Sequence, residues 1–366
     1  MKVGFYSPLP PAPTGVADYS SSLLKALRRR RGVVEVDASH ADVYLYHLGN
    51  NQLHRDIYKR ALDRPGVVVL HDAVLQHFFL GGLSEQEYVA EFTYNYGTWN
   101  EDLARTLWRE RARSATDPRY FDYPMLRRVA ETSLAVIVHN PAAAAMVRDH
   151  HHAARVYEIP HFYEPRDAPP AYDVERLRAG FQLPAGTFLF GVFGHLRESK
   201  RIAPILRTLK RVRRELPAAL LAAGEFASTD LARSIEPCLK SPGILRVGYL
   251  PERDFDLHAA VIDACINLRH PAAGETSGIA IRLMGLGKPV LVTAGRETSK
   301  FPADASIPID SGAAEEEMLT EAMVWLARFP GDAREIGRRA ATHIRERHSL
   351  EHAADLYWEV LKEGGR

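Results

Sequence analysis

Short apolar runs alternate with longer amphipathic stretches along this chain of 366 residues, and that alternation restricts its fold more than any other feature. Runs that are apolar on both faces are typical of buried parallel strands, and helical segments between them indicate βαβ units. The pattern therefore predicts an α/β protein. The runs that we expect to form strands are residues 2–7, 42–48, 67–71, 134–139 and 156–160 in the first half, and 188–193, 219–223, 245–249, 264–268 and 289–293 in the second half.

The alternation pauses at residues 164–172, which read EPRDAPPAY. Three prolines in nine residues can continue neither a helix nor a central strand. A rule of about 150 residues per domain predicts two domains, and we place the linker between them in this stretch. The predicted domains span 1–165 and 166–345, with a further helix in 346–366. Two doubly wound sheets in tandem bind a ligand at the carboxyl ends of their strands, in the crevice between them.

Residues 73–133 are too many for a plain connection between two strands, and they predict an inserted helical segment. Ser84 and Glu87 have the spacing of a capping box that opens a helix. The segment is rich in aromatic residues, which we interpret as the core of the insert. The alternative is that a few of them line a site for an acceptor sugar. These residues are Phe78, Phe79, Tyr88, Phe92, Tyr94, Tyr96, Trp99 and Trp108.

The composition argues against several classes of protein. With 47 basic and 46 acidic residues, the net charge of +1 gives no reason to expect nucleic acid as a partner. Two cysteines, Cys238 and Cys265, make neither a disulfide framework nor a metal cluster, and they fit a reducing compartment. The N-terminal sequence MKVGFYSP lacks the apolar core of a signal peptide, and no run approaches the roughly 20 apolar residues of a membrane span. We therefore expect a cytoplasmic protein.

Four consecutive arginines, residues 28–31, predict a solvated helix end. The alternative is contact with anionic lipid, for which four arginines are weak support. We therefore expect the protein to bind the membrane at most peripherally, on the inner face of the membrane.

A loop with the sequence GETSG, residues 274–278, follows a predicted strand and opens a helix that ends near Gly287. The backbone N–H groups of such a loop and the helix N-terminus form an anion site suited to a diphosphate. Glu275 lies at the mouth of the loop, where a carboxylate accepts hydrogen bonds from sugar hydroxyls. The alternative is a plain tight turn, because many α/β loops look similar.

Four motifs carry a resemblance to a known family: Gly274-Glu275-x-x-Gly278, Gly287-Lys288-Pro289-Val290, VGYL at 247–250 and GVFGHLRESK at 191–200. Together they resemble the signature of the retaining glycosyltransferases of family 4, or glycosyltransferase group 1, and the resemblance covers nearly the whole chain. It implies the GT-B fold, in which two Rossmann-like doubly wound domains face each other across a cleft and a C-terminal helix crosses back to the N-terminal domain. It also implies a retaining transferase of the hexosyltransferase type, with an acceptor-side N-terminal domain and a C-terminal domain for the nucleotide-sugar.

The resemblance assigns the donor diphosphate to Arg197 and Lys200. Breaking a sugar–diphosphate bond builds charge on phosphate oxygens, and fixed cations lower that barrier. Arginine suits bidentate contact with phosphate, and lysine acts as a point charge. Thr276, Ser277 and Gly278 are expected to add the donors of the loop to the same phosphates.

Two further positions lie in the N-terminal half. Gly15 belongs to a segment similar to the family's glycine loop near the donor phosphates, although Val16 replaces the second glycine of the usual pair. His71 ends a predicted strand where the family often has a histidine beside the transferred sugar. His71 and Glu275, which the resemblance assigns to sugar hydroxyls, are the predicted catalytic residues. The alternatives are a proline-stiffened turn at Gly15 and a structural histidine at His71.

The chain departs from the family at its second glutamate, which generally contacts the donor ribose. Leu283 occupies that position, and Arg282 stands there if the helix is aligned on Gly287. We predict that Arg282 contacts the nucleotide by donating hydrogen bonds or stacking on the base, with pairing to a nearby acid as the alternative. The lost glutamate is the main support for an alternative function, a catalytically weak GT-B-like binding protein. A nucleotide-sugar epimerase of the GT-B type is the other alternative, and Glu275 without a separate acceptor site would favour it.

No metal or other cofactor is expected, because Arg197, Lys200 and a helix N-terminus meet the phosphate charge. Asp254 and Asp256 match the D-x-D metal motif of another class of glycosyltransferase, but they open a helix, where acidic residues favour the helix dipole. The expected partners are a nucleotide-sugar donor and a glycan, lipid-linked or small-molecule acceptor. The expected pathway is the synthesis of a glycan or surface polysaccharide.

Overall fold

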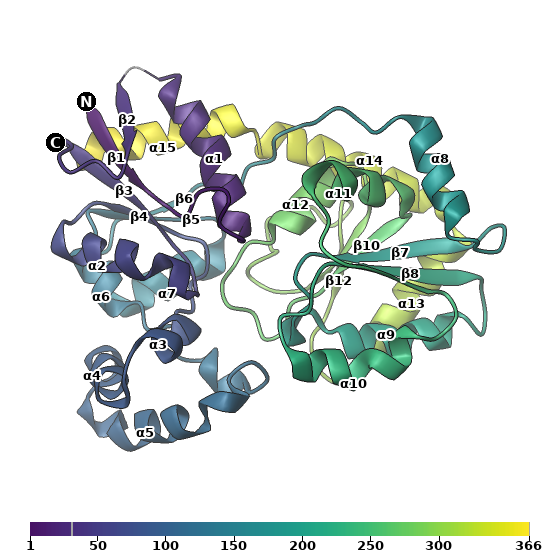
Figure 1. Ribbon diagram of the computed structural model, residues 1–366, viewed down its shortest axis with the longest axis horizontal. Helices are drawn as coiled ribbons and strands as arrows, with labels where there is room; N and C mark the ends of the chain where they lie inside the picture. Colours follow the sequence, from purple (N-terminus) through teal and green to yellow (C-terminus); the bar gives the residue numbers. More distant parts are fainter. Residues whose placement is uncertain (31, 366) are drawn as a thin grey trace. The chain divides into compact units, whose positions relative to one another are not determined.

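The computed structural model describes residues 1–30 and 32–365, which form two compact units (Figure 1). The first unit comprises Met1–Glu164, Pro271–Thr276 and His348–Arg366, and the second comprises Pro165–His270 and Ser277–Arg347. The chain first passes between the units inside the proline-rich stretch. Each unit contains a six-stranded sheet with helices on both of its faces, so the predicted α/β fold class is confirmed.

The sheet of the first unit has the strand order β2-β1-β3-β4-β5-β6, and all neighbouring strands are parallel. All residues of β4 and β5 are buried, as expected for central strands that are covered on both faces. The carboxyl ends of these parallel strands lie at one end of the sheet. The strands are β1 (Lys2–Tyr6), β2 (Val33–Val36), β3 (Val43–Leu48), β4 (Val67–Leu70), β5 (Ala135–Val138) and β6 (Val156–Glu158).

Helices α1 (Gly15–Arg28) and α15 (Leu350–Gly364) cover one face of this sheet (Figure 1). Leu23 of α1 and Tyr357 of α15 share a core with Val3 and Leu45 of the sheet. The apolar stripe in the last helix is therefore buried within the first unit. The opposite face is covered by α2 (Arg55–Asp63), α6 (Arg127–Thr132) and α7 (Pro141–His150), and a short 3-10 turn, Gln52–His54, precedes α2.

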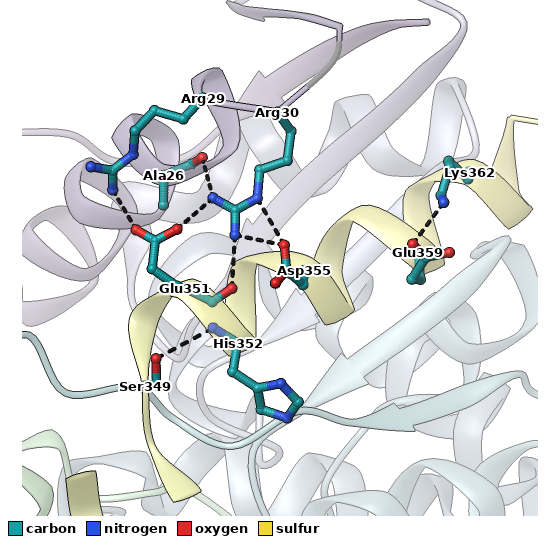
Figure 2. A network of polar contacts seen from close by, with 9 residues as sticks. All are labelled: Ala26, Arg29, Arg30, Ser349, Glu351, His352, Asp355, Glu359 and Lys362. Atoms are coloured by element: carbon teal, nitrogen blue, oxygen red, sulfur yellow. Dashed lines mark hydrogen bonds and ion pairs between the residues drawn. The ribbon is translucent and has the colours of Figure 1, made fainter. Parts of the chain in front are cut away.

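The arginines after α1 pair with α15 (Figure 2). Arg29 donates to Glu351 at 2.7 Å, and Arg30 donates to Glu351 at 2.8 Å and to Asp355 at 2.7 Å. The side chain of Arg30 is 12% exposed, so the prediction of a solvated helix end is wrong for this residue. Arg31 lies outside the described residues.

The insert consists of α3 (Gln76–Gly82), α4 (Glu85–Tyr96) and α5 (Glu101–Glu110), joined and followed by 3-10 turns at Thr98–Asn100, Arg111–Arg113 and Pro118–Tyr120. The predicted capping box is confirmed, because the Ser84 hydroxyl accepts from the Glu87 N–H and the Glu87 carboxylate accepts from the Ser84 N–H. Most of the aromatic residues form the core of the insert, as predicted. Tyr94 and Trp99 are exceptions, with 37% and 83% of their surfaces exposed.

The sheet of the second unit has the order β12-β11-β10-β7-β8-β9 and is also parallel throughout. Its strands are β7 (Phe188–Phe193), β8 (Ala218–Ala223), β9 (Ile244–Val247), β10 (Ala264–Asn267), β11 (Val290–Thr293) and β12 (Ile307–Ile309). One face carries α9 (Ile202–Val212), α10 (Thr229–Leu239) and α13 (Glu315–Arg328). The other carries α8 (Ala171–Gly180), α11 (Glu252–Val261), α12 (Gly278–Gly285) and α14 (Pro330–Arg347).

The described part of the chain, residues 1–30 and 32–365, contains no helix with both the length and the hydropathy needed to cross a bilayer.

Candidate functional site

Lys200 is held at the carboxyl end of β7, in the second unit. The strand turns at Gly194, whose φ of +77° favours glycine, and a 3-10 turn, Glu198–Lys200, follows. The Lys200 Nζ donates to the backbone oxygen of Phe193, and the residue is only 5% exposed. Gly194 lies between this Nζ and the start of α12, because a Cβ built on Gly194 would be 3.2 Å from the Lys200 Nζ and 3.5 Å from the side chain of Ile279. The lysine charge therefore lies beside the first turn of α12.

Two arginines of the second unit act on the charge of Lys200. Burial lowers the pKa of Lys200 well below its usual value, and the nearby positive charges of Arg269 and Arg197 lower it further. A cationic group that is both buried and repelled by its neighbours favours the arrival of an anion. The two predicted diphosphate residues, Arg197 and Lys200, are thus joined by a third cation that the sequence motifs did not reveal.

Arg269 connects these cations to the N-terminus of α12. Its backbone N–H donates to the Thr293 hydroxyl at 2.9 Å, which fixes the residue just after β10. Its guanidinium lies 3.4 Å from the Ser277 hydroxyl. Ser277 in turn caps α12 by accepting from the Ala280 N–H at 3.2 Å. Arg269 could have been identified from the sequence by its position directly after the central strand β10.

The segment Pro271–Thr276 belongs to the first unit, where backbone groups after β4 hold it. The N–H groups of Ala73 and Val74 donate to the Ala273 oxygen at 2.9 and 3.1 Å. The Ala273 N–H donates to the Glu275 carboxylate at 2.7 Å. Glu275 therefore has a fixed place at the carboxyl end of β4, the same end at which His71 lies.

Gly274 makes this close approach feasible. Its φ is +68°, and a Cβ there would lie 2.7 Å from the Cβ of Ala73 and 3.0 Å from the Sδ of Met146. A larger residue would push the segment away. The glycine that the motif analysis placed in a phosphate loop thus has a packing role in the first unit.

Four histidines of the first unit meet around Tyr19, although the sequence singled out only His71. His47 lies in β3, His71 follows β4, His139 follows β5 and His161 comes after β6. Their successive ring centroids are 5.2, 5.4 and 5.6 Å apart, and the ring of Tyr19 lies 5.0 Å from His71 and 4.9 Å from His161. Adjacent parallel strands bring these rings together at their carboxyl ends, so no sequence motif marks the cluster.

Burial keeps the imidazoles of this cluster neutral at pH 7. It lowers the pKa of His71 and His47 well below the usual range, and neighbouring imidazoles contribute. The pKa of His139 is lowered to about 4, mainly by burial, and that of His161 to about 3 for the same reason. A neutral His71 offers a sugar one hydrogen-bond donor or acceptor, but no charge.

A hydrogen bond to His47 occupies one nitrogen of His71. The Nδ1 of His47 and the Nε2 of His71 are 2.9 Å apart. The Nε2 of His47 is buried and has no partner among the described residues. A buried N–H without an acceptor is rarer than an unfilled lone pair, so the pattern places the proton of His47 on Nδ1. His71 then accepts at Nε2 and carries its own proton on Nδ1.

Gly15 is the first residue of α1, directly after the N-cap Thr14, whose hydroxyl accepts from the Val16 N–H at 3.4 Å. A Cβ at Gly15 would meet no atom of the described residues within 4 Å. The fold itself therefore does not require glycine at this position.

Arg282 has protein partners in the second unit. Its guanidinium donates to Asp256 at 2.6 and 3.0 Å and lies 4.0 Å from the ring centroid of Phe255. Leu283, at the position of the family's second glutamate, is fully buried. Asp256, the second acid of the D-x-D sequence, is thus engaged in an ion pair. Within residues 1–30 and 32–365, no group of three or more histidine, cysteine or acidic side chains is arranged to hold a metal.

The predicted site residues are divided between the units. Those of the first unit are Gly15, His71, Glu275 and Thr276, and those of the second are Arg197, Lys200, Ser277, Gly278 and Arg282. Within the second unit Arg269 contacts Ser277 and acts on the charge of Lys200, as Arg197 also does. Within the first, His71 and the segment containing Glu275 share one end of the sheet.

The comparisons with known proteins concern structure alone, because no family model and no curated sequence matches the chain. HepE of Anabaena, solved in complex with UDP-glucose, is similar over 99% of this chain and 100% of its own, with 14% identity and a TM-score of 0.70. The sucrose-phosphate synthase of Thermosynechococcus elongatus is similar over 99% and 98%, with 14% identity and a TM-score of 0.71.

WaaG, a glycosyltransferase involved in lipopolysaccharide biosynthesis, is similar over 97% of this chain and 99% of its own, with 14% identity and a TM-score of 0.61. At such identities the likeness establishes architecture and leaves activity to be argued from the site. The chain has the GT-B fold.

Proposed function

We propose that this protein is a glycosyltransferase that moves a sugar from a nucleoside diphosphate sugar to an acceptor, with retention of anomeric configuration and without a metal ion. The observation that carries the proposal is that Lys200 lies beside the Ser277-capped N-terminus of α12, that Arg269 contacts Ser277, and that the charges of Arg269 and Arg197 both act on Lys200. Three cations and a helix N-terminus suit a diphosphate. The GT-B fold supports this assignment, because neighbours with that fold include a protein solved with UDP-glucose.

The chemistry follows from this charge arrangement. The bond between the anomeric carbon and the diphosphate oxygen breaks, and its electron pair stays on that oxygen. Lys200, Arg197 and Arg269 stabilise the charge that develops there. The acceptor oxygen forms the new bond to the anomeric carbon, and its proton passes to the departing phosphate. This front-face route retains configuration and requires no nucleophilic side chain.

The sugar is assigned to residues of the first unit. Glu275 accepts hydrogen bonds from sugar hydroxyls, and neutral His71 forms one further hydrogen bond with the sugar. Both roles are compatible with the fixed segment Pro271–Thr276 and with the low pKa of His71. We further propose a cytoplasmic enzyme of glycan or surface polysaccharide synthesis that acts on a glycan, lipid-linked or small-molecule acceptor.

A ligand screen tests the donor. The protein is heated with UDP, GDP, ADP or dTDP, or with the corresponding glucose conjugate, in the presence of EDTA. One nucleotide should stabilise the fold by about 2.7 kcal/mol at 100 times its dissociation constant. The matching sugar conjugate should then be turned over, even slowly to water, with release of the diphosphate. Turnover that EDTA abolishes and magnesium or manganese restores would contradict the metal-free mechanism.

Turnover also separates an enzyme from a binding protein. Stabilisation by a nucleotide sugar without any release of nucleotide, with a range of acceptors present, would favour a GT-B-like binding protein. Conversion of the sugar without release would favour an epimerase.

A further inference from the structure

Asn140 holds the segment that contains Glu275, although no sequence motif includes Asn140 in the site. It follows His139 at the end of β5 and caps the N-terminus of α7. The residue is 3% exposed, and it belongs to the first unit together with Pro271–Thr276. Its side chain therefore acts inside one compact unit.

The two ends of the Asn140 carboxamide have separate tasks. The Oδ1 accepts from the Ala143 N–H at 2.9 Å and so caps α7. The Nδ2 donates to the Gly274 backbone oxygen at 2.9 Å and to the Thr276 hydroxyl at 3.0 Å. An amide NH₂ has two donors, and these two bonds use both of them. Aspartate would keep the cap and lose both donors.

We propose that Asn140 is a positioning residue for Glu275. Its two bonds fix the residues on either side of Glu275, while Ala73 and Val74 fix Ala273 just before them. The carboxylate thereby keeps one location relative to β4 and His71. The consequence for turnover rests on the proposed function, whereas the fixing of the segment does not.

Asn140→Asp tests the proposal with a change of one functional group. The Ala73 and Val74 amides donate to Ala273, so their hydrogen exchange reports whether the segment stays in place. Loss of two hydrogen bonds should accelerate exchange at these amides roughly fivefold to a hundredfold. The helix should persist, because aspartate is a good N-cap.

Two further variants serve as controls. Thr276→Val removes one of the two bonds and should accelerate exchange less than Asn140→Asp. Asn95 has the same pattern of bonds in the insert, accepting from the Arg127 N–H at 2.9 Å and donating to the Glu91 oxygen at 2.8 Å. Asn95→Asp should leave exchange at Ala73 and Val74 unchanged.

Turnover is measured with UDP-glucose as the probe, read as released UDP. The kcat of Asn140→Asp should fall about tenfold to a hundredfold, because small displacements of a reacting group have effects of that size. Affinity for UDP should fall less than kcat, because Arg197 and Lys200 are untouched and only Thr276 of the predicted phosphate contacts loses its hydrogen bond to Asn140.

Unchanged exchange at Ala73 and Val74 in Asn140→Asp would overturn the proposal, and so would accelerated exchange with an unchanged kcat. If the wild-type protein releases no UDP, the proposed function fails for this donor. The exchange result still decides whether Asn140 holds the segment.

Discussion

At the scale of single residues, the chain contains ionisable groups whose burial favours their neutral forms. Lys200 is the main example, since it is buried and lies near Arg197 and Arg269. The histidines around Tyr19 are the second example. Buried ionisable groups with shifted pKa values destabilise the ligand-free protein and are typical of binding and catalytic sites.

Replacement of Lys200 by methionine should stabilise the free protein by about 1 to 3 kcal/mol, because it removes a buried charge that has no carboxylate among the causes of its pKa shift. The folded pKa lies below the unfolded value, so unfolding binds a proton between the two. The contribution of Lys200 to the free energy of unfolding therefore rises with pH up to about 10.4.

Urea unfolding at pH 7 and pH 9 checks this prediction. Wild type should gain more stability over that interval than Lys200→Met. Lys240→Met is the control, because the side chain of Lys240 is 74% exposed. A Lys200→Met variant that unfolds more easily at both pH values would contradict the prediction, because it would show that the folded protein stabilises the Lys200 charge.

The histidine cluster should make the fold sensitive to acid. The pKa of His139 is about 4 when folded, against about 6.5 when unfolded. The stabilising neutral form is fully present above pH 6.5, and its contribution is lost as the pH falls towards 4. For His139 alone the loss amounts to about 3 kcal/mol.

Urea unfolding between pH 7 and pH 4.5 measures this slope. His139→Asn should flatten it, whereas His352→Asn, a change at an exposed position on α15, should not. Equal slopes in wild type and His139→Asn would refute the assignment of the acid sensitivity to this residue.

At the scale of elements, the sequence predicted ten of the twelve strands found in residues 1–30 and 32–365, and the two that it missed lie at sheet edges. β2 has four residues and exposes Val33, and β12 has three residues with a proline in the middle. Neither segment has the continuous apolar run that marks the central strands, whose two faces are both covered, although the edge strands β6 and β9 were predicted.

Only part of the candidate site was predicted, because only some of its residues lie in motifs of consecutive residues. Arg197, Lys200 and Glu275 fall in local motifs that can be read from consecutive residues. His47, His139, His161 and Arg269 are each alone in sequence and meet their neighbours only through the parallel order of the strands. Their shared position at strand ends was the only signal available.

The contact between α11 and α12 gives a prediction at this scale. Arg282 is 23% exposed and Asp256 is 9% exposed in their ion pair. Arg282→Ala should lower the free energy of unfolding by about 2 to 3 kcal/mol, because it leaves a mostly buried carboxylate without its closest cation. Asp256→Ala combined with Arg282→Ala should cost less than the sum of the two single changes.

The same variants test the nucleotide contact that the sequence predicts for Arg282. If folded Arg282→Ala binds UDP as tightly as wild type, Arg282 serves only the contact between α11 and α12. If its affinity for UDP falls tenfold, the predicted nucleotide contact is supported. Unchanged stability in Arg282→Ala would contradict the structural role.

At the scale of the whole molecule, the first unit is assembled from distant parts of the chain. Its core includes side chains of α15, which follows the entire second unit in sequence. The buried residues of α15 are Leu350, Ala353, Ala354, Tyr357, Trp358, Val360 and Leu361. Burying each large apolar side chain contributes about 1.5 to 3 kcal/mol, so their sum is comparable to the total stability of a domain.

A fragment of residues 1–164 should therefore not fold by itself. Circular dichroism should show no cooperative thermal transition, and Trp358→Ala in the full chain should lower the stability of the first unit by about 3 kcal/mol. A cooperative transition in the isolated fragment would show that the sheet and α1 suffice without α15.

The central claim is that Arg197, Lys200 and Arg269 bind the diphosphate of a nucleotide-sugar donor. Calorimetric titration in EDTA tests it most directly, with the nucleoside diphosphate that stabilises the protein best and with the corresponding nucleoside. We predict that Lys200→Met weakens diphosphate binding at least tenfold, that nucleoside binding changes little, and that Lys240→Met binds both as wild type does. Equally tight binding of the diphosphate by Lys200→Met and wild type, or no binding of any of the four diphosphates by the wild-type protein, would contradict a diphosphate site at these cations.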